Sequence, residues 1–242
     1  MHAENIDFFP LSIVLDGVEV ISDLVLLRER GVDTIIILDL ELKDPHSSPG
    51  IIRVQIVCVD FKTERRFSLC MKALFFDKDG TLVDDSGFPK VIPTDNIYTE
   101  RTVEGLRALQ SEYSLFIVSN QGWISTGRMA IDEAEAVFKS VISRYAEYGV
   151  RIADYRFCPH GKADGCACRK PLCGMVESLA AQYGITKEGS WFIGDLETDV
   201  LAGKAFGIQT CVVKNGKEYA GKTQPDLVLA DVNAFAKYVL KL

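Results

Sequence analysis

The sequence lacks the long apolar run, the basic excess and the low-complexity tracts that characterise several classes of protein. None of its 242 residues belongs to an apolar stretch near the roughly 20 residues that a membrane-spanning helix requires. The first residues, MHAENIDFFP, contain no cationic segment followed by a long apolar core, so a secretory signal is not expected. The net charge is −7, whereas proteins that bind nucleic-acid phosphates usually carry a basic face. These absences argue against a membrane protein and a nucleic-acid-binding protein.

Histidine is also scarce, and one of the three histidines lies among clustered cysteines. Cys158, His160, Cys166 and Cys168 form a C-x-H segment followed five residues later by C-x-C. Four such ligands complete a tetrahedral zinc shell, and a shell with no vacant position favours a structural ion. Free thiols are the alternative, while disulfides are disfavoured in a chain without an export signal. The pattern predicts a structural Zn²⁺ site and a cytoplasmic protein.

From residue 71 onward, strand-like apolar runs alternate with segments of helical periodicity. The strand-like runs are 73–76, 115–118, 155–157, 191–193, 210–213 and 227–229, and helical spacing occurs at 102–110, 131–145 and 171–183. Gly184 offers a C-terminal stop for the last of these helices. Strands separated by helices predict an α/β fold with a doubly wound, mostly parallel sheet.

The first 70 residues follow a different pattern. Segments 12–15, 34–40 and 51–59 are strand-like, 18–30 has the character of a helix, and 44–50 is a loop by its Pro and Gly content. This part carries 12 acidic against 7 basic residues and no catalytic constellation. We predict a small β-rich N-terminal extension at 1–70, of unknown role, next to a main domain at 71–242. A separate binding module is the alternative.

Polar side chains follow several of the predicted strands of the main domain. Asp77 and Asp79 come directly after the first strand, Ser119 ends the second, and Asp195 follows a later one. Arg169 and Lys170 precede a predicted helix. Because the carboxyl ends of parallel strands meet at one edge of the sheet, these groups can converge there. Each group alone has an ordinary explanation as a turn or a cap, but their joint occurrence predicts an active site.

These residues resemble the haloacid dehalogenase (HAD) superfamily of phosphatases over 71–242, with Asp77-Lys78-Asp79-Gly80-Thr81 as the signature. The resemblance implies that Asp77 attacks phosphorus and that Asp79 is the general acid and base. It implies a catalytic Mg²⁺ held by Asp77, Asp195 and the backbone carbonyl of Asp79. It further implies that Ser119 and Lys170 bind the phosphoryl oxygens. Asp199 would either support the metal or cap a helix.

The zinc loop narrows the resemblance to the subgroup of heptose-bisphosphate and histidinol-phosphate phosphatases, which have no large cap domain. It implies that loop residues contact a small phosphorylated metabolite. These residues are Asp85, Ser86, Gly87, Phe88, Asn120, Gln121, Gly122 and Arg169. The expected substrate is a sugar bisphosphate such as D-glycero-D-manno-heptose 1,7-bisphosphate, with histidinol phosphate as the alternative.

The sequence departs from the family pattern at a few positions. Lys78 stands where Arg is more usual, and Ser119 where Thr is more usual, but both changes keep the required chemistry. Residues 122–128 differ from the usual turn of the heptose branch, which bears on the choice of substrate. A non-catalytic scaffold with this fold is the alternative from another class. It predicts damage to the reacting residues, yet all of them are present.

Overall fold

The computed structural model describes residues 6–15, 18–29, 32–37, 57–60 and 65–68 by their backbone, and residues 71–86 and 95–242 with their side chains. The chain divides into two compact units, Met1–Cys70 and Met71–Leu242. Among the described residues, no helix is long and apolar enough to cross a membrane.

The first unit is β-rich, as predicted. Its strands are β1 (Ile6–Leu15), β2 (Val18–Glu29), β3 (Val32–Ile37), β4 (Val57–Asp60) and β5 (Arg65–Ser68). The first three form an antiparallel sheet in the order β1-β2-β3, and β4 pairs with β5.

The helix predicted at 18–30 is wrong, because Val18–Glu29 is the central strand of the three-stranded sheet. Leu15 pairs with Val18, and the two residues between them in the sequence are Asp-Gly, a dipeptide favoured in tight hairpins. Four of the twelve residues of this strand are Val or Ile, which fit the pleated surface of a sheet. The loop predicted at 44–50 lies outside the described residues, as do parts of the strands predicted at 34–40 and 51–59.

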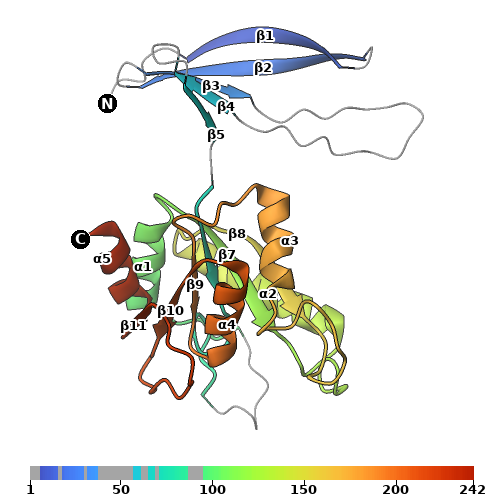
Figure 1. The fold of residues 1–242 in the computed structure, drawn as a ribbon, viewed down its shortest axis with the longest axis vertical. Coiled ribbons are helices and arrows are strands. Elements are labelled where there is room, and N and C mark those ends of the chain that lie inside the picture. The colour runs from blue at the N-terminus through green and yellow to red at the C-terminus, as the bar shows by residue number, and fades with distance from the viewer. Residues whose placement is uncertain are drawn as a thin grey trace. The chain divides into compact units, whose positions relative to one another are not determined.

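The second unit contains a six-stranded parallel sheet (Figure 1). Its strands are β6 (Ala73–Phe76), β7 (Ser114–Asn120), β8 (Ile152–Cys158), β9 (Trp191–Gly194), β10 (Gln209–Val213) and β11 (Leu227–Leu229). The spatial order is β11-β10-β9-β6-β7-β8, and every pair is parallel. The predicted doubly wound α/β fold is therefore confirmed.

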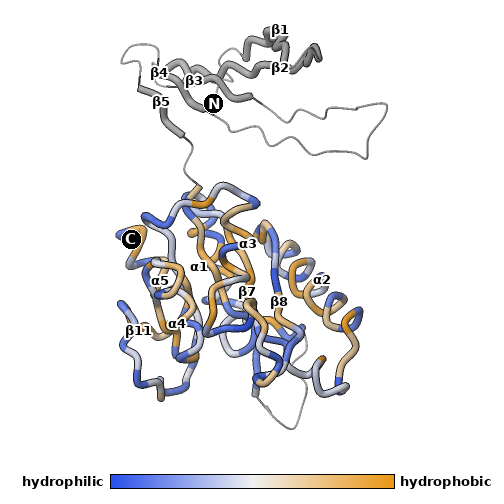
Figure 2. The backbone as a smooth tube through the Cα atoms, turned by 45° about the vertical axis from the view of Figure 1, so that its right-hand side comes forward, coloured by the Kyte–Doolittle hydropathy of each residue, from blue (hydrophilic) through white to orange (hydrophobic). Residues whose placement is uncertain are grey.

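Helices cover both faces of this sheet. They are α1 (Arg101–Leu109), α2 (Ile131–Glu147), α3 (Gly174–Tyr183), α4 (Glu197–Phe206) and α5 (Val232–Leu240). Because side chains alternate along a strand, Leu74 and Phe76 of β6 pack with α1, α2 and α5, while Ala73 and Phe75 pack with α3 and α4. Apolar residues, orange in Figure 2, accordingly run along the strands of this unit. Burial on both faces explains why β6 is entirely apolar.

The helix predicted at 171–183 begins three residues later than expected, at Gly174. The chain first makes a turn in which Leu172 N donates to Arg169 O at 2.9 Å, so the helical bonds start only afterwards. The helix ends at Gly184, as predicted. The longest connection between consecutive elements of this unit, 77–100, is too short for a separate cap domain.

The topology places a crevice at one edge of the sheet. From β6 the chain proceeds to β7 and β8 on one side, then crosses back to β9 on the other side of β6. In open α/β sheets, ligands bind outside the carboxyl ends of the strands where the order reverses in this way. The residues after β6, β7 and β9 therefore face a common site.

Candidate active site

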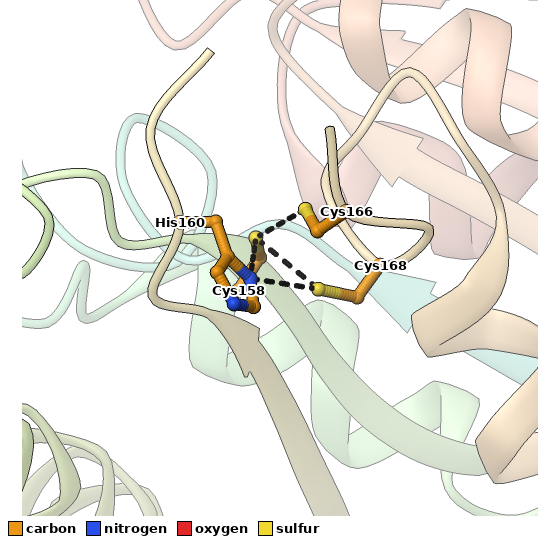
Figure 3. Close-up of side chains that lie close together, drawn as sticks. All are labelled: Cys158, His160, Cys166 and Cys168. Carbon is orange, nitrogen blue, oxygen red and sulfur yellow. Dashed lines mark hydrogen bonds between the residues drawn. The ribbon is translucent and has the colours of Figure 1, made fainter. Parts of the chain in front are cut away.

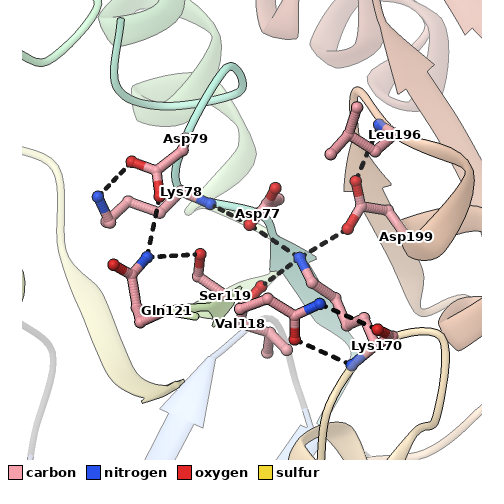
Figure 4. Close-up of polar contacts among 10 residues, drawn as sticks. Asp77, Lys78, Asp79, Val118, Ser119, Gln121, Lys170, Leu196 and Asp199 are labelled. Atoms are coloured by element: carbon pink, nitrogen blue, oxygen red, sulfur yellow. Dashed lines mark hydrogen bonds and ion pairs between the residues drawn. The ribbon is translucent and has the colours of Figure 1, made fainter. Parts of the chain in front are cut away.

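Lys170 connects two carboxylates at the centre of this edge. Its Nζ lies 2.8 Å from Asp77 Oδ1 and 2.6 Å from Asp199 Oδ1, and it donates to Val118 O at 3.0 Å (Figure 4). All three charged residues are buried. Burial alone would lower the pKa of Lys170, but the two carboxylates raise it above its ordinary value, so the ammonium group stays charged.

Three carboxylates gather at the same place. Oxygen atoms of Asp77, Asp195 and Asp199 all lie within 4.8 Å of one another. The Asp195 Oδ1 atom is buried and has no hydrogen-bond partner among the described residues. Burial, followed by the charges of Asp77 and Asp199, raises the pKa of Asp195 to about 8. A buried oxygen without a partner, in a cluster of like charges, fits a hard divalent cation such as Mg²⁺.

Gly80 makes room for this cluster. A Cβ atom on Gly80 would lie 2.4 Å from Asp195 Oδ2, and its φ of 81° is in the left-handed region that favours glycine. The turn after β6 can therefore bring Asp77 and Asp79 close to Asp195 only with glycine at this position.

Asp79 is held from two sides. Lys78 Nζ donates to Asp79 Oδ1, and Gln121 Nε2 donates to Asp79 Oδ2 at 2.9 Å. The Lys78 side chain is fully buried beside the ring of Phe138, with 5.6 Å between Nζ and the ring centroid. Burial raises the pKa of the Asp79 carboxyl and the nearby Asp77 charge adds to this, although Lys78 opposes both. A raised pKa suits a carboxyl group that must carry a proton for part of a reaction.

Ser119 and Asn120 end β7 beside these residues. Ser119 is buried and accepts a hydrogen bond from Gln121 Nε2 at 3.1 Å. Asn120 binds the backbone of Lys170 in both directions: Lys170 N donates to Asn120 Oδ1 at 3.0 Å, and Asn120 Nδ2 donates to Lys170 O at 2.9 Å. These two hydrogen bonds fix the segment that carries Lys170 to the end of β7.

Asp199 combines the two roles that the sequence leaves open. Its Oδ2 accepts from Leu196 N at 3.0 Å at the start of α4, while its Oδ1 faces Lys170. The same carboxylate thus caps a helix and belongs to the acidic cluster of the site.

The four predicted zinc ligands lie together at the end of β8 (Figure 3). Cys158 Sγ lies 3.5 Å from His160 Nδ1, 3.6 Å from Cys166 Sγ and 3.4 Å from Cys168 Sγ, and His160 Nδ1 lies 3.3 Å from Cys168 Sγ. A tetrahedron with zinc–sulfur bonds of about 2.3 Å has edges of roughly 3.7 Å. The arrangement could therefore close around one zinc ion with small adjustments.

A hydrogen bond connects the Cys/His cluster to the neighbouring Arg169. Arg169 Nη1 donates to His160 O at 2.7 Å. Arg169 also lies over Gly122, where a Cβ atom would come within 3.3 Å of Nη1. A side chain at position 122 would require the guanidinium group to move by a few tenths of an ångström, so glycine permits the present approach.

A cavity of about 500 Å³ opens above the carboxylates. It is lined by Asp77, Asp79, Asp85, Ser119, Asn120, Gly122, Trp123, Lys162, Arg169, Lys170, Leu196 and Thr198. Most of the predicted catalytic and substrate-binding residues are in this lining. Gln121 points instead toward Asp79, and Ser86 bonds to Asp84. Gly87 and Phe88 lie outside the described residues.

Sequence reasoning missed Lys162, Leu196 and Thr198 as lining residues. Lys162 is the only cation between His160 and Cys166, and Thr198 follows the strand that delivers Asp195. Both positions could have been inferred, because Lys162 lies on the loop between the Cys/His residues and Thr198 lies in the first turn of α4, between Asp195 and Asp199.

Comparisons with known proteins agree with this geometry. A sequence model of the HAD-hydrolase-like family matches residues 167–235. The D-glycero-beta-D-manno-heptose-1,7-bisphosphate 7-phosphatase of Pseudomonas putida is 31% identical over 175 residues, which cover 70% of this chain and 100% of that protein. The corresponding enzyme of Pasteurella multocida is 33% identical, covering 69% of this chain and 96% of its own length. A histidine biosynthesis bifunctional protein of Legionella pneumophila is 33% identical over 130 residues but is covered over only 37% of its length.

A solved structure has the same fold. The D,D-heptose 1,7-bisphosphate phosphatase of Bordetella bronchiseptica, in complex with magnesium and phosphate, superposes with a TM-score of 0.64 at 27% identity. The match covers 71% of this chain and 99% of that one. With the fold, the carboxylate cluster and these relatives in agreement, the chain belongs to the HAD-like hydrolases and is a phosphatase, a hydrolase of phosphoric monoesters.

Proposed function

We propose that the protein is a magnesium-dependent sugar bisphosphate phosphatase that works through an aspartyl-phosphate on Asp77. The expected substrate is D-glycero-D-manno-heptose 1,7-bisphosphate or a close analogue. The main support is the convergence of Asp77, Asp79, Ser119 and Lys170 on one cavity, together with relatives named for this reaction.

In the first step, Asp77 attacks phosphorus. Its Oδ1 accepts from Lys78 N at 2.7 Å and faces Lys170, so Oδ2 is the oxygen left to form the bond. As the Asp77–phosphorus bond forms, the bond from phosphorus to the leaving oxygen breaks, and Asp79 gives that oxygen its proton. Lys170 and the Ser119 hydroxyl stabilise the charge on the phosphoryl oxygens.

In the second step, Asp79 takes a proton from water. The resulting hydroxide attacks phosphorus, and the bond to Asp77 breaks, which releases inorganic phosphate and restores the carboxylate. Asp77 and Asp195, which form one cluster with Asp199, would hold Mg²⁺ together with the backbone carbonyl of Asp79. The ion would neutralise the carboxylates and the phosphoryl group when bound.

The charges at the mouth of the cavity favour a substrate with a second anionic group. Lys162 and Arg169 both line the cavity beyond the reacting carboxylates. The acid on the same wall, Asp85, forms an ion pair with Lys217, which reduces its repulsion of an anion. Trp123, with the Arg128 guanidinium 3.8 Å from its ring centroid, supplies a flat apolar wall suited to a sugar face.

Histidinol phosphate fits the charges at the cavity entrance less well than a bisphosphate does. That molecule carries an ammonium group, which two cations at the entrance would repel. The five-residue spacing between His160 and Cys166 and the partial match to a histidine biosynthesis protein still make it the second candidate. Comparison of kcat/KM for the two substrates separates them.

We also propose that the cluster of Cys158, His160, Cys166 and Cys168 binds a structural zinc ion. The ion would hold the loop that carries Lys162 and lies next to Arg169 and Lys170. Thiol ligands of this kind persist in a reducing compartment, consistent with the predicted cytoplasmic location.

The Asp77→Asn variant tests the catalytic part of the proposal. We expect Mg²⁺-dependent phosphate release to fall by at least about 10⁴-fold, since removal of an essential nucleophile has effects of this order or larger. Asp132→Asn, which makes the same change at an exposed position of α2, should be fully active. Release of phosphate by Asp77→Asn at the wild-type rate would refute the nucleophile assignment.

A further inference from the structure

Gln121 has an unusual place in the site. It follows β7 at the sheet edge, next to residues that line the cavity, yet its side chain is only 2% exposed and is not part of that lining. Its amide points between Asp79 and Ser119 (Figure 4). Contact with substrate therefore does not account for the residue.

The amide nitrogen of Gln121 has two hydrogens, and each has an acceptor. One lies toward Asp79 Oδ2 at 2.9 Å and the other toward Ser119 Oγ at 3.1 Å. A single rigid group thus sets the separation between a carboxyl group and a hydroxyl group that both line the cavity. Glutamine is suited to this, because neither a methionine nor a glutamate of similar length can donate both bonds.

The backbone of Gln121 is fixed as well. Its N–H donates to Cys158 O at 2.8 Å, and the preceding residue, Asn120, pairs with Cys158 in the sheet. The position of the amide is therefore determined by the end of β8, where the Cys/His cluster begins.

We propose that Gln121 is a positioning residue that holds Asp79 at the correct distance from the phosphoryl group bound at Ser119. The inference rests on the proposed function, in which Asp79 protonates the leaving oxygen. Proton transfer needs the carboxyl group within hydrogen-bond reach of that oxygen. A shift of Asp79 by a fraction of an ångström slows this transfer without removing any group that binds phosphate.

Substrates whose leaving groups differ in their need for a proton can detect such a shift of Asp79. Phenolate is a poor leaving group and needs the proton from Asp79, whereas p-nitrophenolate is stable as an anion and leaves with little help. Phenyl phosphate and p-nitrophenyl phosphate are otherwise similar in shape. A defect in proton donation affects the first substrate selectively, while a defect in folding or phosphate binding affects both equally.

The experiment compares kcat/KM on these two substrates for the wild type, Gln121→Met and Gln121→Glu, with Asp79→Asn as the reference for a lost acid. We expect kcat/KM of both Gln121 variants to fall by about 10- to 100-fold with phenyl phosphate and by less than about 3-fold with p-nitrophenyl phosphate. The larger loss is a part of the rate enhancement of about 10²–10⁴-fold that acid–base catalysis supplies. Gln209→Met, an exposed glutamine at the start of β10, should match the wild type on both.

Each outcome is decisive. Equal losses on the two substrates, or no loss, would overturn the positioning role of Gln121 while leaving the proposed function intact. If Asp79→Asn itself shows no preference for the better leaving group, the acid assignment fails instead.

Discussion

Two lysines near the same loop have opposite surroundings. Lys170 is 3% exposed and touches two carboxylates, so its charge is held in place for the role proposed for it at the phosphoryl group. Lys162 is exposed at the mouth of the cavity and forms no ion pair with the side chains of residues 71–86 and 95–242 that the structure describes. Its charge is therefore available to a substrate, and its loss should change substrate choice rather than chemistry.

We expect Lys162→Gln to raise KM for heptose bisphosphate by about 5-fold, the factor given by the roughly 1 kcal/mol of an exposed charge contact. The value of kcat should stay near that of the wild type, and KM for histidinol phosphate should stay constant or fall. Steady-state kinetics at low salt provide the measurement, because salt screens an exposed charge.

Lys139→Gln, an exposed lysine of α2, is the matched control for this prediction. A Lys162→Gln variant with unchanged KM for the bisphosphate would remove Lys162 from the substrate site.

At the scale of single elements, the loop of the Cys/His cluster connects the proposed zinc ligands to the proposed catalytic residues. Cys158 O accepts from Gln121 N, and Lys170 is hydrogen-bonded to Asn120, so both ends of the loop are tied to the carboxyl end of β7. Loosening of the cluster should thus misplace several groups of the site together.

Cys166→Ser, or removal of zinc by a chelator, should lower kcat by about 10-fold or more while excess Mg²⁺ is present. Structural zinc also contributes to folding, so the thermal midpoint should fall. Cys173→Ser, which lies outside the four ligands, is the control. Full activity in protein that elemental analysis shows to be free of zinc would contradict this prediction.

A second element, α5, begins at a charged cap. Asp231 Oδ1 accepts from Ala234 N at 2.8 Å, and Oδ2 accepts from Arg101 Nε at 2.6 Å. Partial burial raises the pKa of Asp231, but Arg101 and the N–H groups at the start of the helix outweigh it, so the net pKa is lowered. A lowered pKa in the folded state means that the carboxylate stabilises the fold above its unfolded pKa of about 3.9, and that this contribution is lost as the pH falls through the folded pKa.

Asp231→Ala should therefore lower the free energy of unfolding by about 1 kcal/mol at pH 7, the usual value for a lost cap. The difference from the wild type should shrink at pH 3.5. Urea unfolding at the two pH values gives the measurement, and Asp231→Asn, which keeps a capping oxygen without the charge, should show less pH dependence. An equal deficit at both pH values would exclude the charge as the cause.

The elements show what could be predicted from sequence. Strands buried on both faces, such as β6, are recognisable because they are wholly apolar. The segment Val18–Glu29 is harder to recognise, because its apolar residues fit either periodicity. The Asp-Gly dipeptide before it and its two antiparallel partners decide the outcome. The bonds of Gln121 could not be predicted either, since they depend on how β7 and β8 align.

At the scale of the whole molecule, the described residues of the site all belong to the unit Met71–Leu242. We therefore propose that this unit is the phosphatase domain and that residues 1–70 are an extension with another role. Met71–Leu242 expressed alone should keep kcat/KM within about 3-fold of the full chain, measured under the same conditions. A loss of more than about 10-fold would show that the extension takes part in catalysis.

The attachment of the Cys/His loop at its two ends has a consequence for how this enzyme can change over evolution. The segment 161–165 between the ligand pairs carries Lys162 to the cavity mouth, and its Asp164 bonds back to Gly161 within the segment. The bonds that reach Asp79 and Lys170 start from Cys158 and Asn120 instead. Insertions or substitutions in 161–165 can thus reshape the entrance and its charge while the reacting groups stay in place, so new substrate preferences can arise without rebuilding the chemistry.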